Sequence, residues 1–343
     1  MDAGLRYSRS FDSVGVAPET SAFQNALNRL LCGTNTALPE IHRTQVCTAD
    51  QEPRAPALSR IAEASTYNTQ MTTVQTLAST NGATIGYQTV GSGPSVIVIP
   101  GALSIAADFE TFAGALAANF TVHTMERRGR GRSSPQDAGY CMAVERNDVG
   151  ALQAHTQAAY LFGHSYGGRI ALESARNSVL IKKVAVYEPG ISVKGSIATT
   201  WATRYGHLVA QNKRLDAFVE FSKGAGPDRA KNTPRWLLKL LMPVVIKRHD
   251  LQKKLGLLES NLREHQEIAR LDSAYQDFGD ISAAVMVMIG GKSDLPWVAP
   301  AVDKLIATLP RVRVKQFPNL NHFGPDQSGP REVAETVTAF FTN

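Results

Sequence analysis

Along residues 74–343, short apolar runs alternate with stretches in which apolar residues recur every third or fourth position. The first pattern is typical of strands and the second of amphipathic helices. Strands are expected at 74–78, 84–90, 95–99, 121–125, 158–163, 182–187, 284–289 and 312–317. Helices are expected at 108–119, 146–157, 169–175, 298–309 and 332–341. This alternation predicts an α/β fold with a doubly wound, mostly parallel sheet.

Two stretches interrupt the alternation. Residues 190–280 are mostly helical in pattern and fall between the sixth and seventh expected strands. Ligands of open α/β sheets bind beyond the carboxyl ends of the strands, so we interpret 190–280 as a helical cap inserted over such a site. Residues 1–70 show little periodicity outside a candidate helix at 19–32, and we interpret them as a loosely ordered extension ahead of one domain at 71–343.

Composition indicates a globular protein whose cysteines are free thiols. The chain has 343 residues, of which 43% are hydrophobic, enough for a large core. It contains no apolar stretch of transmembrane length and no secretory signal pattern. Its three cysteines have no disulfide-framework spacing. We therefore expect a cytoplasmic protein, either a monomer or a homodimer.

The net charge of +6 is concentrated in the expected cap, where residues 194–254 hold 13 Lys or Arg and four acidic residues. Aromatic residues do not alternate with these bases, so nucleic acid is not an expected partner. We favour a solvated basic face over attraction of an anionic substrate or a membrane surface. The apolar run 236–246 is interpreted first as packing within the cap, and second as the lining of an apolar pocket or a contact with lipid.

The stretch Gly163-His164-Ser165-Tyr166-Gly167-Gly168 joins the expected strand at 158–163 to the helix that follows. A strand that reverses into a helix within so few residues holds the residue between them in a cramped conformation, which small neighbours make possible. This is the G-x-S-x-G pattern of a nucleophile elbow, in the strand–turn–helix context that the motif requires. Ser165 is therefore the expected nucleophile of a serine hydrolase.

A serine nucleophile needs a base, and the base needs an acid that orients it. His322 follows the last expected strand and precedes the final helix, which places it at the same edge of the sheet as Ser165. We favour Asp294 as the acid, because it lies in a glycine turn after a strand. Glu188, at the end of the preceding strand, is the alternative acid.

Two backbone N–H groups should bind the oxyanion. One belongs to Tyr166, directly after the nucleophile, and the other to Ala102 or Leu103 in the loop after strand 95–99. This chemistry implies no metal and no organic cofactor.

Four motifs in order give residues 71–343 a resemblance to the α/β-hydrolase superfamily, in its capped esterase and haloperoxidase-like branch. They are PGA at 100–102, ERRGRGRSS at 126–134, GHSYGG at 163–168, and the pair GGKSD at 290–294 with NH at 321–322. Pro100 stands where the family usually has His, and Glu126 where it usually has Asp. Epoxide hydrolases and haloalkane dehalogenases of this fold use an aspartate nucleophile, which Ser165 argues against.

The resemblance implies hydrolysis of a carboxylic ester, thioester or lactone of small size through an acyl-enzyme. Two alternatives use the same three residues, namely acyl transfer to an acceptor other than water and hydrolysis of a C–C bond. A third alternative is a ligand-binding protein that has kept the fold without catalysis.

Overall fold

The computed structural model describes residues 73–343, apart from the side chain of Asn81. The extension expected at 1–70 and its candidate helix at 19–32 lie outside the described residues.

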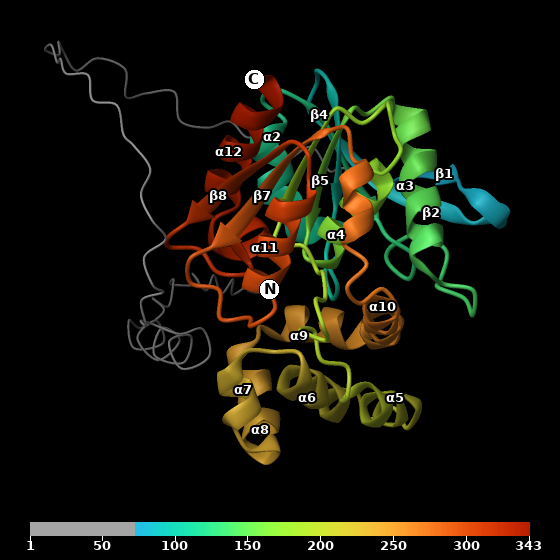
Figure 1. Cartoon of the computed structure of the whole chain (residues 1–343). Helices are drawn as coiled ribbons and strands as arrows, with labels where there is room; N and C mark the ends of the chain where they lie inside the picture. Colours follow the sequence, from blue (N-terminus) through green and yellow to red (C-terminus); the bar gives the residue numbers. More distant parts are fainter. Residues whose placement is uncertain (1–72) are drawn as a thin grey trace, which may run out of the picture.

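Within residues 73–343, eight strands form one sheet in the order β1-β2-β4-β3-β5-β6-β7-β8 (Figure 1). β1 pairs antiparallel with β2, and β2 with β4, whereas the remaining neighbours pair parallel. The predicted mostly parallel sheet is confirmed. The strands are β1 Gln75–Ala78, β2 Thr84–Val90, β3 Ser95–Ile99, β4 Thr121–Glu126, β5 Tyr160–His164, β6 Lys183–Tyr187, β7 Ala284–Gly290 and β8 Val312–Phe317.

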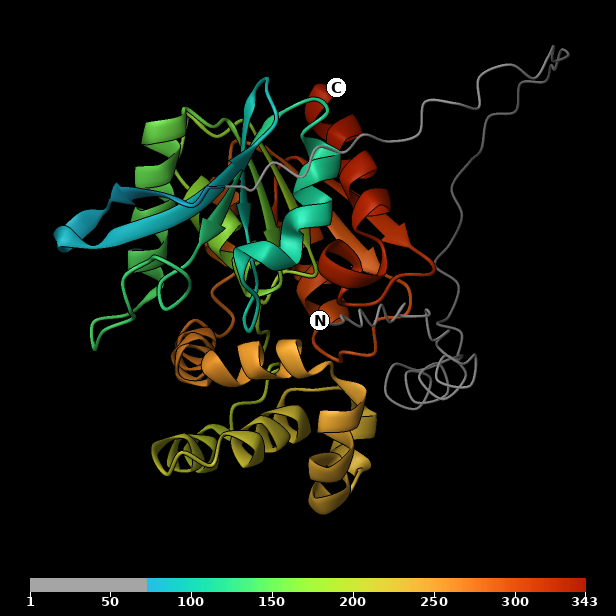
Figure 2. The same ribbon diagram turned by 180° about the vertical axis from the view of Figure 1, so that it is seen from behind.

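Helices cover both faces of this sheet (Figures 1 and 2). They are α2 Glu110–Leu116, α3 Met142–Thr156, α4 Tyr166–Ala175, α11 Val298–Thr308 and α12 Pro330–Thr342. Short helical turns are η1 Thr80–Gly82, η2 Ala106–Phe109, η3 Gln276–Asp280 and η4 Gly324–Ser328. The helix expected at 108–119 is divided into η2 and α2, and the Asp108 carboxylate accepts a hydrogen bond of 2.9 Å from the backbone N–H of Ile105.

Alternate residues along the central strands enter two separate cores, as the period of two in a strand requires. Ile97, Leu161 and Val184 pack with α3, α4 and α11 on one face. Val98 and Phe162 pack with α2 and α12 on the other. The continuous apolar runs of the sequence therefore mark strands that are buried on both faces.

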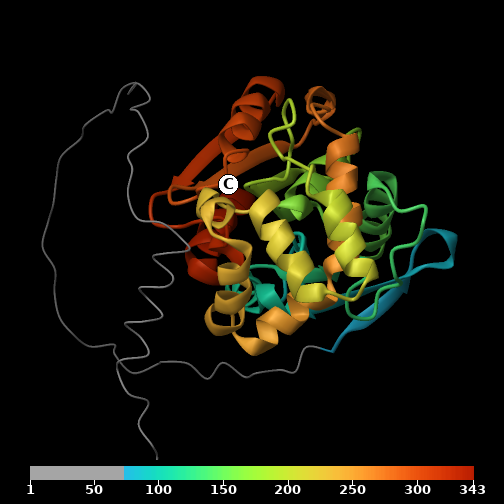
Figure 3. The ribbon, with the colours of Figure 1, turned by 90° about the horizontal axis from the view of Figure 1, so that it is seen from below.

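Six helices lie between β6 and β7 at the edge where the parallel strands end. We call α5–α10 the helical insertion, and Figure 3 shows most of it in front of the sheet when the molecule is seen from that end. Its bounds are α5 Ala202–Ala210, α6 Arg214–Gly224, α7 Asp228–Asn232, α8 Arg235–Val245, α9 Arg248–Gly256 and α10 Leu258–Arg270. It has a third apolar core of its own, built around Trp201, Tyr205 and Phe218.

None of the helices in the described part of the chain is both long and apolar enough to cross a lipid bilayer.

The packing of the α2 and α12 face predicts a large loss of stability for Phe162→Ala. Phe162 is fully buried and its ring centroid lies 4.2 Å from that of Phe112. The free energy of unfolding should fall by about 3–5 kcal/mol, as for other buried phenylalanines. Val314→Ala on the edge strand β8, where the side chain is 46% exposed, is the control and should change it by less than about 0.5 kcal/mol. Urea unfolding measures both, and equal losses would contradict the assignment of the core.

Candidate active site

Ser165 occupies a strained turn between β5 and α4. Its φ of 54° and ψ of −122° are unusual for a residue with a side chain and cost about 1–3 kcal/mol. Two backbone hydrogen bonds to the next strand and its loop stabilise this conformation. The Ser165 N–H donates to the carbonyl of Tyr187 at 3.0 Å, and the N–H of Gly190 donates to the carbonyl of Ser165 at 2.7 Å.

Glycines on either side allow this turn to pack tightly. A Cβ on Gly163 would clash with the backbone of Gly167, and a Cβ on Gly167 would clash with the carbonyl of Ile99 at the end of β3. Both flanking glycines are therefore required by close backbone approach. The turn lies directly against β3 and its following loop.

His322 and Glu188 form a close pair beside this turn. The distance from His322 Nδ1 to Glu188 Oε2 is 2.7 Å, and the Glu188 side chain is fully buried. Glu188 also accepts hydrogen bonds from the N–H of Gly290 at 2.8 Å and from Ser293 Oγ at 2.9 Å. Its carboxylate is thus fixed from two sides, and His322 keeps Nε2 free of this contact.

The expectation that Asp294 would contact His322 is corrected by this geometry. The turn after β7 donates its Gly290 N–H and Ser293 hydroxyl to Glu188, and the structure records no hydrogen bond between Asp294 and His322. Glu188 follows β6, which pairs directly with the strand of the elbow, whereas β7 is one strand further away. Asp294 is exposed, although partial desolvation raises the pKa of its carboxyl.

His164, the residue before Ser165, joins the elbow to the loop of His322. Its Nε2 donates a hydrogen bond of 2.7 Å to the backbone carbonyl of His322, and the two ring centroids lie 4.9 Å apart. Burial lowers the pKa of His164 well below its usual value, so this imidazole is neutral. The contact places His322 next to the elbow although the two are far apart in sequence.

The loop after β3 is held in place by Arg127, which follows β4. Arg127 Nη1 donates to the carbonyls of Gly101 at 3.1 Å and Pro100 at 3.4 Å. The C=O and N–H of a trans peptide point in opposite directions, so the N–H of Ala102 points away from Arg127. Gly101 packs on the elbow, since a Cβ on it would lie 3.1 Å from Ser165 Cβ. Among the described residues, neither the Ala102 nor the Tyr166 N–H has a recorded hydrogen-bond acceptor.

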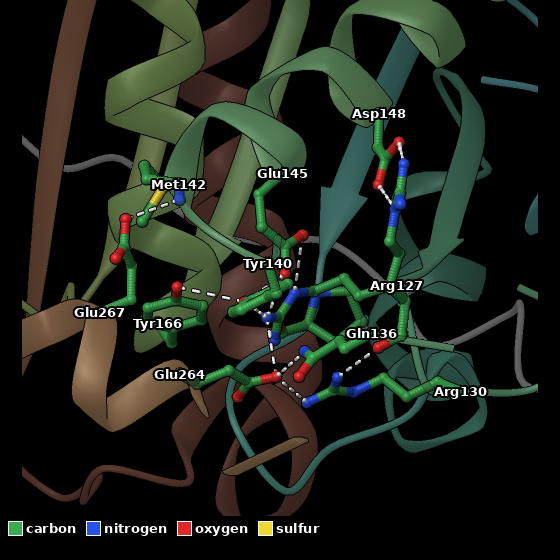
Figure 4. Close-up of polar contacts among 12 residues, drawn as sticks. Arg127, Arg130, Gln136, Tyr140, Met142, Glu145, Asp148, Tyr166, Glu264 and Glu267 are labelled. Carbon is green, nitrogen blue, oxygen red and sulfur yellow. Dashed lines mark hydrogen bonds and ion pairs between the residues drawn. The ribbon is translucent and has the colours of Figure 1, made fainter. Parts of the chain in front are cut away.

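A fully buried charge cluster, formed by Arg127, Arg130, Glu145 and Glu264, surrounds this guanidinium (Figure 4). Arg127 Nη2 lies 2.6 Å from Glu145 Oε1 and 2.9 Å from Glu264 Oε1, and Arg130 Nη2 lies 2.8 Å from the same oxygen of Glu264. Burial alone would lower the pKa of Arg127, but the two carboxylates outweigh it and raise that pKa well above its usual value. Burial would likewise raise the pKa of Glu145, but Arg127 reverses the shift and keeps it lowered.

Asp326, which lies in η4, is a further titratable group near His322. Burial raises the pKa of Asp326 to about 7, although Lys254 and His322 oppose this shift. Burial also lowers the pKa of Lys254, in helix α9 of the insertion. Lys254 of the insertion therefore acts on a group close to His322.

A family model described as the alpha/beta hydrolase family matches residues 96–336. The chain belongs to the α/β-hydrolase family. This match includes Ser165, Glu188, Asp294 and His322.

Solved structures share the fold over most of the described residues, and a curated protein matches part of the sequence. An alpha/beta hydrolase from Sphaerobacter thermophilus superposes with a TM-score of 0.67 and 28% identity, covering 78% of this chain and all of that one. The esterase RhEst1 from Rhodococcus sp. superposes with a TM-score of 0.61 and 18% identity, covering 79% of this chain and 98% of that one. An uncharacterized hydrolase, YraK of Bacillus subtilis, is 38% identical over 96 residues, which are 27% of this chain and 35% of that protein.

The role of Arg127 in this α/β-hydrolase was not evident from its motif alone. The ERRGRGRSS stretch contributes to the family resemblance, but its sequence gives no partner for Arg127. Its partners come from distant segments, namely Glu145 on α3 and Glu264 on α10. The only local signal was a run of arginines at a strand end, and nothing near Glu264 marked it as their counter-ion.

Glu264→Gln should loosen the attachment of the helical insertion. The change leaves Arg130 without its carboxylate and removes one of the two that face Arg127, and breaking a buried pair costs about 3–5 kcal/mol. Glu259→Gln on the same helix is the control, because its side chain is 62% exposed and lies 3.8 Å from Arg214. It should cost less than about 1 kcal/mol. Denaturant unfolding compares the two, and equal stabilities would contradict the importance of the charge cluster.

Proposed function

We propose that this protein is a serine hydrolase that cleaves a carboxylic ester through an acyl-enzyme on Ser165. The observation that carries the proposal is the hydrogen bond of 2.7 Å between Glu188 and His322 Nδ1, next to a serine on a strained elbow. A carboxylate, an imidazole and a hydroxyl at the carboxyl edge of a sheet form the arrangement that activates a serine. Thioesters and lactones are the related substrates.

In the proposed mechanism, His322 acts through both ring nitrogens. Nδ1–H donates to Glu188, which fixes the tautomer and leaves Nε2 as the base. Nε2 takes the proton of Ser165 as its oxygen attacks the carbonyl carbon. The proton then passes to the leaving alcohol, and the sequence repeats with water to release the acid. The buried Glu188 carboxylate stabilises the imidazolium that forms in each half-reaction.

The N–H groups of Tyr166 and Ala102 are the proposed donors to the oxyanion. Both are without a recorded acceptor among the described residues, and both adjoin the elbow. Arg127 is a positioning residue in this proposal, since it orients the peptide that carries the Ala102 N–H. Each lost donor would typically reduce turnover about 10²- to 10³-fold.

Labelling by a fluorophosphonate probe tests the nucleophile. The probe should react with the native protein at Ser165, located by peptide mass spectrometry, and Ser165→Ala should abolish both labelling and hydrolysis of p-nitrophenyl esters. Ser174→Ala, on the helix that follows the elbow, is the matched control and should leave both intact. Ester hydrolysis that survives Ser165→Ala would refute the proposed mechanism.

Paired substitutions at the two candidate acids test the identity of the third residue. Glu188→Gln should lower kcat by about 10⁴-fold, as amide replacement does in other triads, because the amide no longer stabilises the imidazolium. Asp294→Asn should lower kcat less than about tenfold. Circular dichroism checks that both variants fold. The opposite ranking in steady-state kinetics would restore Asp294 as the acid.

A further inference from the structure

Helix α8 carries an apolar stripe on its outer side. Trp236, Leu240 and Val244 recur every fourth residue and are 68%, 63% and 61% exposed. Residues four apart share one face of a helix, so these side chains form a continuous surface. Leu238 and Met242 occupy a different face and pack into the core of the insertion. The stripe is therefore additional to the side chains that hold α8 in place.

Helix α8, which carries this stripe, lies at the end of the described part of the chain farthest from the sheet (Figure 1). Apart from Trp236, Leu240 and Val244, the large hydrophobic residues exposed in the described part of the chain lie on other elements, namely Val179, Leu180, Ile306, Val314 and Phe323. Apolar side chains that gather at one extremity indicate a contact surface rather than the usual scatter.

Basic residues accompany the stripe without any acid between them. Residues 235–248 contain Arg235, Lys239, Lys247 and Arg248 and no Asp or Glu. Arg235 and Lys239 pair with Glu220 and Asp216, at the edge of α6, yet about half of each side chain remains exposed. Lys247 and Arg248 are exposed, and among the described residues no side-chain ion pair is recorded for them. The patch is thus both apolar and positively charged.

We propose that this patch, defined by Trp236, Leu240, Val244, Lys247 and Arg248, binds the surface of an anionic lipid membrane. An amphipathic helix with an apolar face and flanking bases lies in the interface, with its apolar side chains among the acyl chains. Tryptophan side chains favour the membrane–water interface. Each basic residue near an anionic lipid surface adds to the affinity for the membrane. The chain would rest on the membrane without spanning it.

The charge of the patch favours an anionic membrane over a second copy of the chain as its binding partner. A twofold dimer through α8 brings the same patch of each copy together, so the unpaired bases of both would face one another. Anionic headgroups instead neutralise them. Membrane binding goes beyond the proposed ester hydrolysis and is measured without any substrate, so the two can fail independently.

Vesicle flotation with the full chain tests the proposal. Vesicles of phosphatidylcholine with 30% phosphatidylglycerol should carry the protein to the top of the gradient at low salt, and binding should weaken at least tenfold on pure phosphatidylcholine or in 0.5 M NaCl. Trp201 and Trp297 are buried, so brominated lipids should quench the fluorescence of Trp236 selectively.

Two variants and a control assign the surface. Trp236→Ser/Leu240→Ser and Lys247→Gln/Arg248→Gln should each weaken binding at least tenfold, and neither removes a core contact. Val179→Ser/Leu180→Ser, which removes two exposed apolar side chains outside the insertion, should bind as the native protein does.

Three results would overturn the proposal. The protein could stay at the bottom of the gradient with anionic vesicles, or both patch variants could float like the native chain. A concentration-dependent dimer in light scattering that Trp236→Ser/Leu240→Ser abolishes, without vesicle binding, would assign the patch to a second copy.

Discussion

The arrangement of the site depends on one buried guanidinium. Arg127 contacts a carboxylate from α3, a carboxylate from α10 and two carbonyls of the loop after β3, so three other segments of the chain meet on a single side chain. Removing charges from water costs several kcal/mol per ion, which only close and complete pairing offsets. The cluster therefore tolerates one geometry, and that geometry fixes the peptide carrying the Ala102 N–H. Packing of apolar side chains gives the fold its stability, but it does not orient a peptide in this way.

Two strained residues lie beyond this fixed loop, at the ends of the next two strands of the sheet. Ser165 and Glu188 have φ values of 54° and 40°, a region that residues with side chains avoid. Each ends a central parallel strand, β5 and β6, and each is fixed by hydrogen bonds to its neighbour, since Ser165 N–H donates to Tyr187 and Glu188 accepts from Gly290. The sheet thus stabilises two backbone conformations that would be unfavourable alone. The strained backbones of Ser165 and Glu188 direct both side chains out of the strand pleat, toward the edge of the sheet where His322 lies.

The sequence was most informative where the structure is local. Apolar runs located the strands within one or two residues, because a strand buried on both faces needs such a run, and the glycine pattern located Ser165 because only close backbone approach requires it. For the acid, the hydrogen bond to His322 is made by the alternative residue, Glu188, and the reason is geometric. Glu188 and Asp294 both follow strands, and which of them faces His322 depends on how the turn after β7 folds back. Likewise α3 begins at Met142 rather than near Arg146, and the Met142 N–H donates to Glu267 from α10 at 2.7 Å. No sequence pattern near Met142 predicts its hydrogen bond to Glu267, which is 125 residues further along the chain.

The helical insertion is tied to the site by packing as well as by charge. Leu103, which follows the proposed oxyanion donor Ala102, is 6% exposed and belongs to the apolar core of the insertion, together with Trp201 and Tyr205. Leu103 has a φ of 54°, so its backbone is strained in the conformation that makes this contact. The loop after β3 is therefore held by Arg127 on one side and by the insertion on the other. Since Glu264 of the insertion also pairs with Arg127, both restraints require the insertion to be docked. In the proposed mechanism, a substitution in α10 that touches no substrate would then act on turnover through the orientation of one peptide.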